Sequence, residues 1–68
     1  MAHTYAIRTF DETGLVVRGG VAGAYEAAAA RLATLVPPDY RLIQLTEIGR
    51  SIGVDAVTVS FAALLESV

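Results

Sequence analysis

Apolar and polar positions alternate over three stretches of the chain, as expected of strands with one buried face. These stretches are residues 4–10, 41–48 and 54–62. The alternation is clearest in the last, where Val57, Val59 and Phe61 share one side of an extended chain. Each stretch is predicted to be a strand. Residues 64–68 fit either a continuation of the last strand or a final helical turn.

A turn is predicted directly after the first strand, at Asp11-Glu12-Thr13-Gly14. Aspartate can bond its own downstream backbone, and glycine can take a positive φ. Residues 15–18 (LVVR) then form a return strand, which the pair Gly19-Gly20 ends. Together these segments predict a β-hairpin.

The period changes to that of a helix over residues 21–36, where apolar positions recur three and four residues apart. The pair Pro37-Pro38 ends this helix, because proline restricts the preceding residue and has no backbone N–H. The side chains expected to face the sheet are Tyr25, Ala28, Ala29 and Leu32. Those expected to face outward are Glu26, Ala27, Ala30 and Ala33. High helix propensity explains this outward alanine strip, and so does a docking surface.

The predicted fold is α+β, a ββαββ arrangement with one helix packed on a four-stranded, mainly antiparallel sheet. Residues 1–68 are expected to form a single domain. The sheet face away from the helix carries either Phe10, Leu42 and Ile48 among polar residues, or the reverse assortment. An uncovered face with large apolar groups is expected to be an interface.

Composition adds to the expectation of a partner. The chain is 54% hydrophobic, with a mean hydropathy of +0.55, and a chain of 68 residues buries only about 60% of its unfolded surface. Some apolar surface is therefore expected to meet another protein or a second copy in a homodimer. The absence of cysteine excludes disulfides and thiolate metal sites.

The charge pattern disfavours direct binding of nucleic acid. Five arginines lie singly along a chain whose net charge is −2, whereas phosphate backbones call for a clustered basic face. No stretch approaches the roughly 20 apolar residues that cross a bilayer, and the N-terminus lacks a basic region followed by an apolar one. These features predict a cytoplasmic protein with no membrane association.

Candidate chemistry is sparse. The only histidine, His3, has no cluster of further ligands at metal-binding spacing, and the serines have no other candidate base. We therefore expect no catalytic residue, no metal and no cofactor, and a protein that is not an enzyme.

The candidate residues are instead those of a contact surface. Tyr40, beside the two prolines, is expected to be exposed, and Arg8 and Arg18 are expected to lie opposite each other on the hairpin. The full candidate set for partner binding is Tyr40, Asp39, Asp11, Glu12, Arg8, Arg18, Glu26, Ala27 and Ala30.

The layout of hairpin, alanine-rich helix at Glu26-Ala27-Ala28-Ala29-Ala30 and closing β segment resembles small phage-encoded anti-CRISPR proteins of type I systems. That resemblance implies a non-enzymatic inhibitor that binds a bacterial CRISPR effector complex, a host defence nucleoprotein. It makes Asp11, Glu12, Asp39 and Asp55 candidates for mimicking nucleic-acid charge.

The chain is also similar to the dodecins, flavin-binding homo-oligomers of about this length. The shared features are His3-Thr4-Tyr5 at the start, Asp39-Tyr40 before the middle strand and Val57-Thr58-Val59 near the end. This alternative implies a flavin-binding or storage protein. The family's flavin-stacking tryptophan is Tyr40 here, its glutamine contact has no evident counterpart, and its first strand leads directly into its helix, where residues 15–18 predict an added strand.

Overall fold

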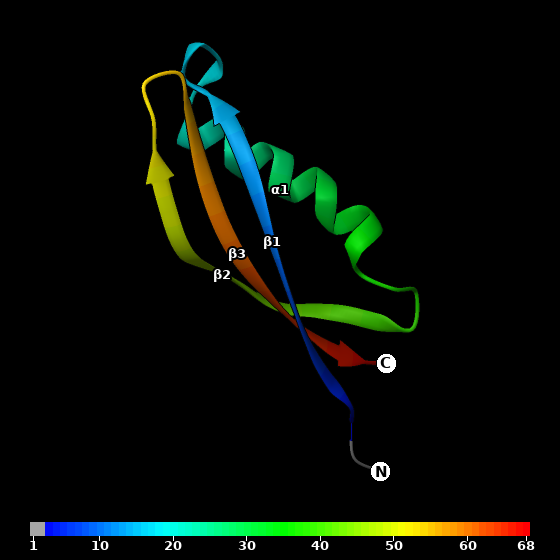
Figure 1. Cartoon of the computed structure of the whole chain (residues 1–68). Helices are drawn as coiled ribbons and strands as arrows, with labels where there is room; N and C mark the ends of the chain where they lie inside the picture. The colour runs from blue at the N-terminus through cyan, green and yellow to red at the C-terminus, as the bar shows by residue number, and fades with distance from the viewer. Residues whose placement is uncertain (1–2) are drawn as a thin grey trace.

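The computed structural model describes residues 3–68 and shows one helix on one face of a three-stranded antiparallel sheet (Figure 1). The sheet order is β1-β3-β2, so the last strand of the chain lies in the middle. The elements are β1 (Tyr5–Leu15), the single 3₁₀ turn η1 (Val16–Arg18), α1 (Val21–Leu35), β2 (Tyr40–Ile52) and β3 (Ala56–Ser67). The α+β class is confirmed.

The predicted hairpin and its return strand are wrong. Asp11, Glu12 and Thr13 continue β1 instead of turning, and they pair with Ser60, Val59 and Thr58 of β3. Because β3 offers partners along this whole length, the ladder of hydrogen bonds outweighs the local turn chemistry. The described sheet therefore has three strands in a βαββ order, not the four of a ββαββ order.

Gly14 serves close packing, not a turn. A Cβ atom at Gly14 would lie 1.9 Å from the carbonyl oxygen of Gly20 and 2.6 Å from the backbone nitrogen of Ala24. The reversal between strand and helix occurs instead at Gly19 and Gly20, whose φ values are +100° and +56°. Only glycine takes these angles without strain, so the pair that was predicted to end a strand makes the strand-to-helix connection.

β2 and β3 are longer than the alternation indicated. The turn between them is confined to residues 53–55, and β3 continues to Ser67, which settles the ending as strand. Register shifts between Leu42 and Gln44 and between Glu47 and Gly49 interrupt β2. Such bulges break strict alternation.

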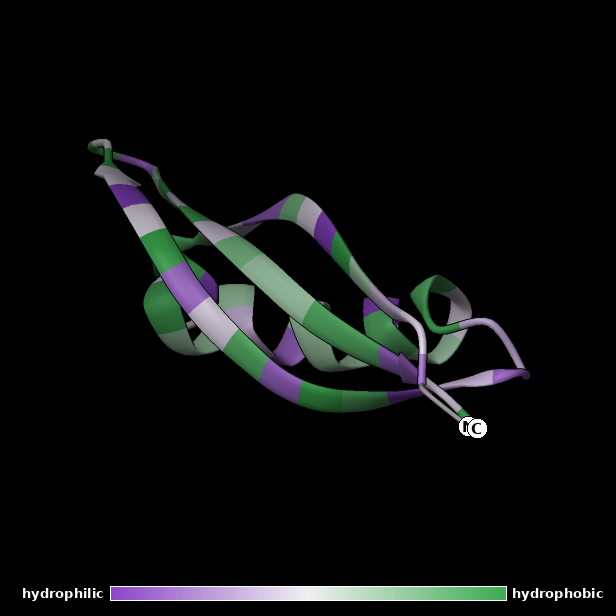
Figure 2. Cartoon of the chain, turned by 90° about the horizontal axis from the view of Figure 1, so that it is seen from below, coloured by the Kyte–Doolittle hydropathy of each residue, from purple (hydrophilic) through white to green (hydrophobic). Residues whose placement is uncertain are grey.

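The core lies between the middle strand and the first half of the helix. Val57, Val59 and Phe61 of β3 are buried as predicted, and Ala24 and Ala28 of α1 cover them. In Figure 2 β3 is accordingly largely apolar, whereas β2 alternates. Phe10 stacks on Phe61 with ring centroids 5.3 Å apart. Phe10, Val21 and Leu45 complete the packing.

The helix meets the sheet through a stripe rotated from the predicted one. Ala24 and Ala28 are buried, whereas Ala29, which was expected to face the sheet, is exposed. Alanines at a spacing of four residues let the helix backbone approach the sheet closely. Tyr25 is 43% exposed, and its ring lies nearly perpendicular to that of Phe61, with the ring centroids 5.2 Å apart.

The open face of the sheet, away from α1, carries both apolar and polar side chains. Phe10 and Leu42 point to the helix side, because they pair with Phe61 and Leu65 of the buried row. The open face instead carries Ile7 opposite Leu64, among serines and threonines. No helix within residues 3–68 is long and apolar enough to cross a membrane.

Candidate functional site

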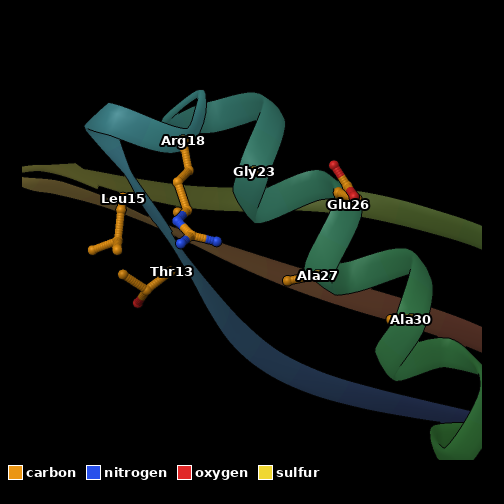
Figure 3. Close-up of a pocket in the computed structure, with 8 residues that line it drawn as sticks. Thr13, Leu15, Arg18, Gly23, Glu26, Ala27 and Ala30 are labelled. Carbon is orange, nitrogen blue, oxygen red and sulfur yellow. The ribbon is translucent and has the colours of Figure 1, made fainter.

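A shallow depression of about 450 Å³ lies between the end of β1 and the outer side of α1 (Figure 3). Its lining residues are Thr13, Gly14, Leu15, Arg18, Gly23, Glu26, Ala27 and Ala30. It forms because the lining is small where strand and helix meet: a Cβ at Gly23 would lie 3.0 Å from the carbonyl oxygen of Arg18. The depression adjoins the outer edge of β1, which has no strand partner within residues 3–68.

Four predicted contact residues meet in this depression: Arg18, Glu26, Ala27 and Ala30. Arg18 extends from η1 toward Thr13 and Leu15, whereas the carboxylate of Glu26 stands on the helix, on the side away from that strand (Figure 3). One cation and one anion thus flank a floor of small residues. Such a surface suits contact with a polypeptide, since it offers an apolar floor and polar margins.

The other predicted residues are dispersed. Arg8 lies on β1 opposite Ala63 and Arg18 lies in η1, so their predicted juxtaposition on a hairpin is wrong. Asp11 lies opposite Ser60 on the open face, whereas Glu12 points to the helix side and pairs with Arg31 at 2.8 Å. Adjacent residues of a strand face opposite sides, which separates these two carboxylates.

Asp39 and Tyr40 lie at the turn that enters β2. The backbone N–H of Tyr40 donates to the carbonyl of Pro37 at 3.0 Å, and the carbonyl of Asp39 accepts from Val68 at 3.0 Å. Tyr40 is half-buried, so less of its ring is available than predicted. Asp55, the fourth acidic candidate, lies in the turn between β2 and β3. The four carboxylates therefore occupy four separate surroundings.

A network of three polar side chains on the open face was not predicted from the sequence. The Tyr5 hydroxyl donates to Glu66 Oε2 at 3.0 Å, and Arg41 donates to Glu66 Oε1 from Nε at 2.9 Å and from Nη2 at 2.5 Å. The three residues come from β1, β3 and β2, so the network crosses the whole sheet. Arg41 and then Tyr5 lower the pKa of Glu66, and the bond to Glu66 raises the pKa of Tyr5.

A second network of the same three residue types joins the helix to β2. Arg50 donates to both carboxylate oxygens of Glu47, at 2.8 Å and 2.9 Å, and the Tyr25 hydroxyl donates to the same carboxylate. Hydrogen bonds from Arg50 and Tyr25 lower the pKa of Glu47 to about 2. The bond to Glu47 raises the pKa of Tyr25. Only the spacing of Glu47 and Arg50 was a signal in the sequence.

Within residues 3–68 no group of three or more His, Asp and Glu side chains lies together as a metal site would require. His3 Nδ1 lies 3.0 Å from the carbonyl oxygen of Ser67, where the two terminal strands end together.

Comparisons with known proteins assign no relative: no family model matches the chain, and neither a curated protein nor a solved structure matches it.

Proposed function

We propose that the chain is the subunit of a homo-oligomer that binds a planar aromatic ligand of the flavin type, as its similarity to the dodecins implies. The observation that carries this proposal is the passage from β1 through one 3₁₀ turn into α1. An added strand at residues 15–18 was the difference in layout between this chain and that family. The absence of that strand from the described sheet removes the difference.

The amount of exposed surface supports assembly. The chain exposes 4583 Å², whereas a compact monomer of 7.1 kDa is expected to expose about 4,100 Å². The helix lies mainly over β1 and β3 and leaves β2 with large exposed side chains. Over residues 40–48 these are Leu42, Ile43 and Ile48. A second subunit that covers β2 would bury them.

Tyr40 is the residue we assign to the ligand. It stands where the resemblance implies a stacking tryptophan, and its half-buried ring begins β2, the strand that the helix leaves open. A tyrosine ring stacks on a planar heterocycle through dispersion and a quadrupole match, with less area than tryptophan offers. We therefore expect weaker stacking than a tryptophan would give.

Titration of riboflavin with the purified protein tests this proposal. The wild type is expected to quench flavin fluorescence in a saturable manner, Tyr40→Ala to lose most of the quenching, and Tyr40→Trp to strengthen it. Tyr40→Phe is the matched control, because it keeps the ring and loses only the hydroxyl, and it should bind like the wild type. Wild-type protein that leaves the fluorescence unchanged would refute the flavin assignment.

A second candidate function is inhibition by protein contact, which the resemblance to anti-CRISPR proteins implies. The meeting of Arg18, Glu26, Ala27 and Ala30 beside the free edge of β1 favours it. The dispersion of the four acidic candidates gives no support to mimicry of nucleic-acid charge. As an inhibitor, this chain would therefore act by occluding a surface of its target complex.

Phage plating on a host with an active type I CRISPR system tests this second candidate. Expression of the protein is expected to raise plaque counts on that host and to change nothing on a host that lacks the system. Ala27→Arg should abolish the gain, whereas Ala33→Glu, an exposed helix position outside the depression, should retain it. Unchanged plaque counts with the wild type would exclude the inhibitor function for that system.

A further inference from the structure

One end of the molecule gathers five exposed aliphatic side chains, here called the apolar tip. They come from the end of β1, from η1, from the end of β2 and from the β2–β3 turn, which lie together at the top of Figure 1. A hydrogen bond of 2.8 Å from the Val16 N–H to the Asp55 carbonyl joins the two segments. The members of the apolar tip are Leu15, Val16, Val17, Ile52 and Val54.

The apolar tip is presented on a hydrogen-bonded frame. The Gly20 N–H donates to the Leu15 carbonyl at 2.9 Å, and the Gly53 N–H donates to the Ala56 carbonyl at 2.9 Å. Val17 and Val54 are nonetheless 89% and 93% exposed, and Ile52 is 74% exposed. Turns ordinarily carry polar residues, glycine or proline, so aliphatic side chains held outward in two adjoining turns need another explanation than folding.

The charged residues beside the apolar tip indicate which kind of partner would cover it. The apolar tip is flanked by one cation, Arg18, and one anion, Asp55, and neither takes part in an ion pair within residues 3–68. A membrane surface would favour several basic residues together with tryptophan or phenylalanine, which the tip lacks. A second copy, in contrast, supplies the opposite charge at each flank when the same surface meets itself about a twofold axis.

We propose that the apolar tip is a contact between two copies of this chain, related by a twofold axis, with Arg18 of one protomer facing Asp55 of its partner. This proposal rests on the homo-oligomer proposed above and adds a second surface to it. Five aliphatic side chains fall short of the roughly 800 Å² per partner of a standard stable interface. The tip contact therefore joins subunits that the β2 surface also holds.

Cysteine cross-linking tests the contact directly, because the chain has no cysteine of its own. Val54→Cys is expected to form a covalent dimer under mild oxidation at micromolar concentration. Ala33→Cys, on the exposed side of the helix and outside the tip, is the matched control and should stay a single chain on a non-reducing gel. Cross-linking of both variants to the same extent, or of neither, would overturn the proposed contact.

Light scattering separates this contact from the proposed oligomer itself. If both proposals hold, the wild type forms a large particle, and Val17→Asp with Val54→Asp reduces it to a smaller oligomer while circular dichroism stays native. Arg18→Glu should reduce it likewise, and adding Asp55→Arg should restore it. A large particle that none of these variants alters would overturn the tip contact alone. A monomeric wild type would overturn the contact and the oligomer together.

Discussion

The two Tyr–Glu–Arg networks use the same residue types on opposite sides of the sheet, but one joins three strands to each other and the other joins the helix to a strand. On the open face Glu66 is 8% exposed and takes partners 61 and 25 residues away in the sequence, one oxygen for each partner. On the helix side the guanidinium of Arg50 donates to both oxygens of Glu47. These two residues are only three apart in the sequence and lie on either side of a bulge in the same strand. The first network holds three strands together, whereas the second fixes the helix on β2 through Tyr25.

The difference shows that burial and sequence separation, more than the residue types, decide what such a network contributes. The Arg50 and Glu47 side chains are 40% and 22% exposed, and such a solvent-accessible pair adds little, because solvent screens it and the side chains lose freedom. A buried carboxylate must be paired, since an unpaired buried charge is strongly unfavourable. We therefore expect the open-face network to matter more for the sheet than the helix-side network does for the helix.

The largest expected effect comes from removing the ring beneath the helix-side network. Phe61→Ala takes away the ring on which the rings of Phe10 and Tyr25 pack. Loss of a buried phenylalanine costs about 3–5 kcal/mol, a large part of the free energy of unfolding of a small domain. Urea denaturation measures it, with Phe61→Leu as the control that keeps most of the volume. An unchanged midpoint in Phe61→Ala would show that this core does not hold the helix.

The next largest effect is expected when each of the two carboxylates is replaced by the same amide. Glu66→Gln is expected to lower Tm by several degrees, and Glu47→Gln by clearly less, because only Glu66 is buried and bonded to two other strands. Thermal unfolding followed by circular dichroism measures both. Equal falls, or a larger fall for Glu47→Gln, would reverse the ranking of the two networks.

Acid is expected to weaken both networks, and the pKa of Glu47 defines the pH range over which the helix-side network is lost. The pKa of Glu47 is about 2 in the folded chain against an ordinary value of 4.5. The unfolded chain therefore binds the proton first, and the stabilisation is complete above about pH 4.5 and lost as the pH falls toward about 2. Glu47→Gln should make the stability flatter across this window. A variant as acid-sensitive as the wild type would assign the sensitivity elsewhere.

The smallest effect is expected in base. Both tyrosines have a pKa raised above 10.0 by their carboxylate partners, so their stabilisation is complete below pH 10 and is lost as the pH rises through the folded pKa. Tyr5→Phe and Tyr25→Phe should each reduce this alkaline loss slightly, as measured by denaturant midpoints at neutral and alkaline pH. Phenylalanine variants with the wild-type alkaline loss would remove the tyrosines as its cause.

Local patterns predicted the elements that depend on neighbours in sequence. The alternation of Val57, Val59 and Phe61 identified the buried row of β3, and the helix was predicted at residues 21–36 against Val21–Leu35 in the structure. The turn at residues 11–14 was mispredicted because Asp11 and Gly14 have turn chemistry whether or not a distant strand pairs with them. Only the fold shows that Gly14 must admit the backbone of Gly20.

The candidate surface was predicted only in part, for the same reason. Helical spacing placed Glu26, Ala27 and Ala30 together, whereas Arg18 was expected opposite Arg8 and joins them only because η1 leads into α1. Glu66 gave no such signal, since its partners Tyr5 and Arg41 are brought to it by the sheet alone. The apolar tip likewise depends on two turns that are far apart in sequence.

The molar mass of the protein in solution shows whether this β-α-β-β subunit assembles with its own copies. Light scattering on the eluting protein at micromolar concentration is expected to give a single particle whose mass is a multiple of 7.1 kDa well above that of a dimer. A particle of 7.1 kDa that persists as the concentration is raised would show that the chain is a monomer and would refute the proposed assembly.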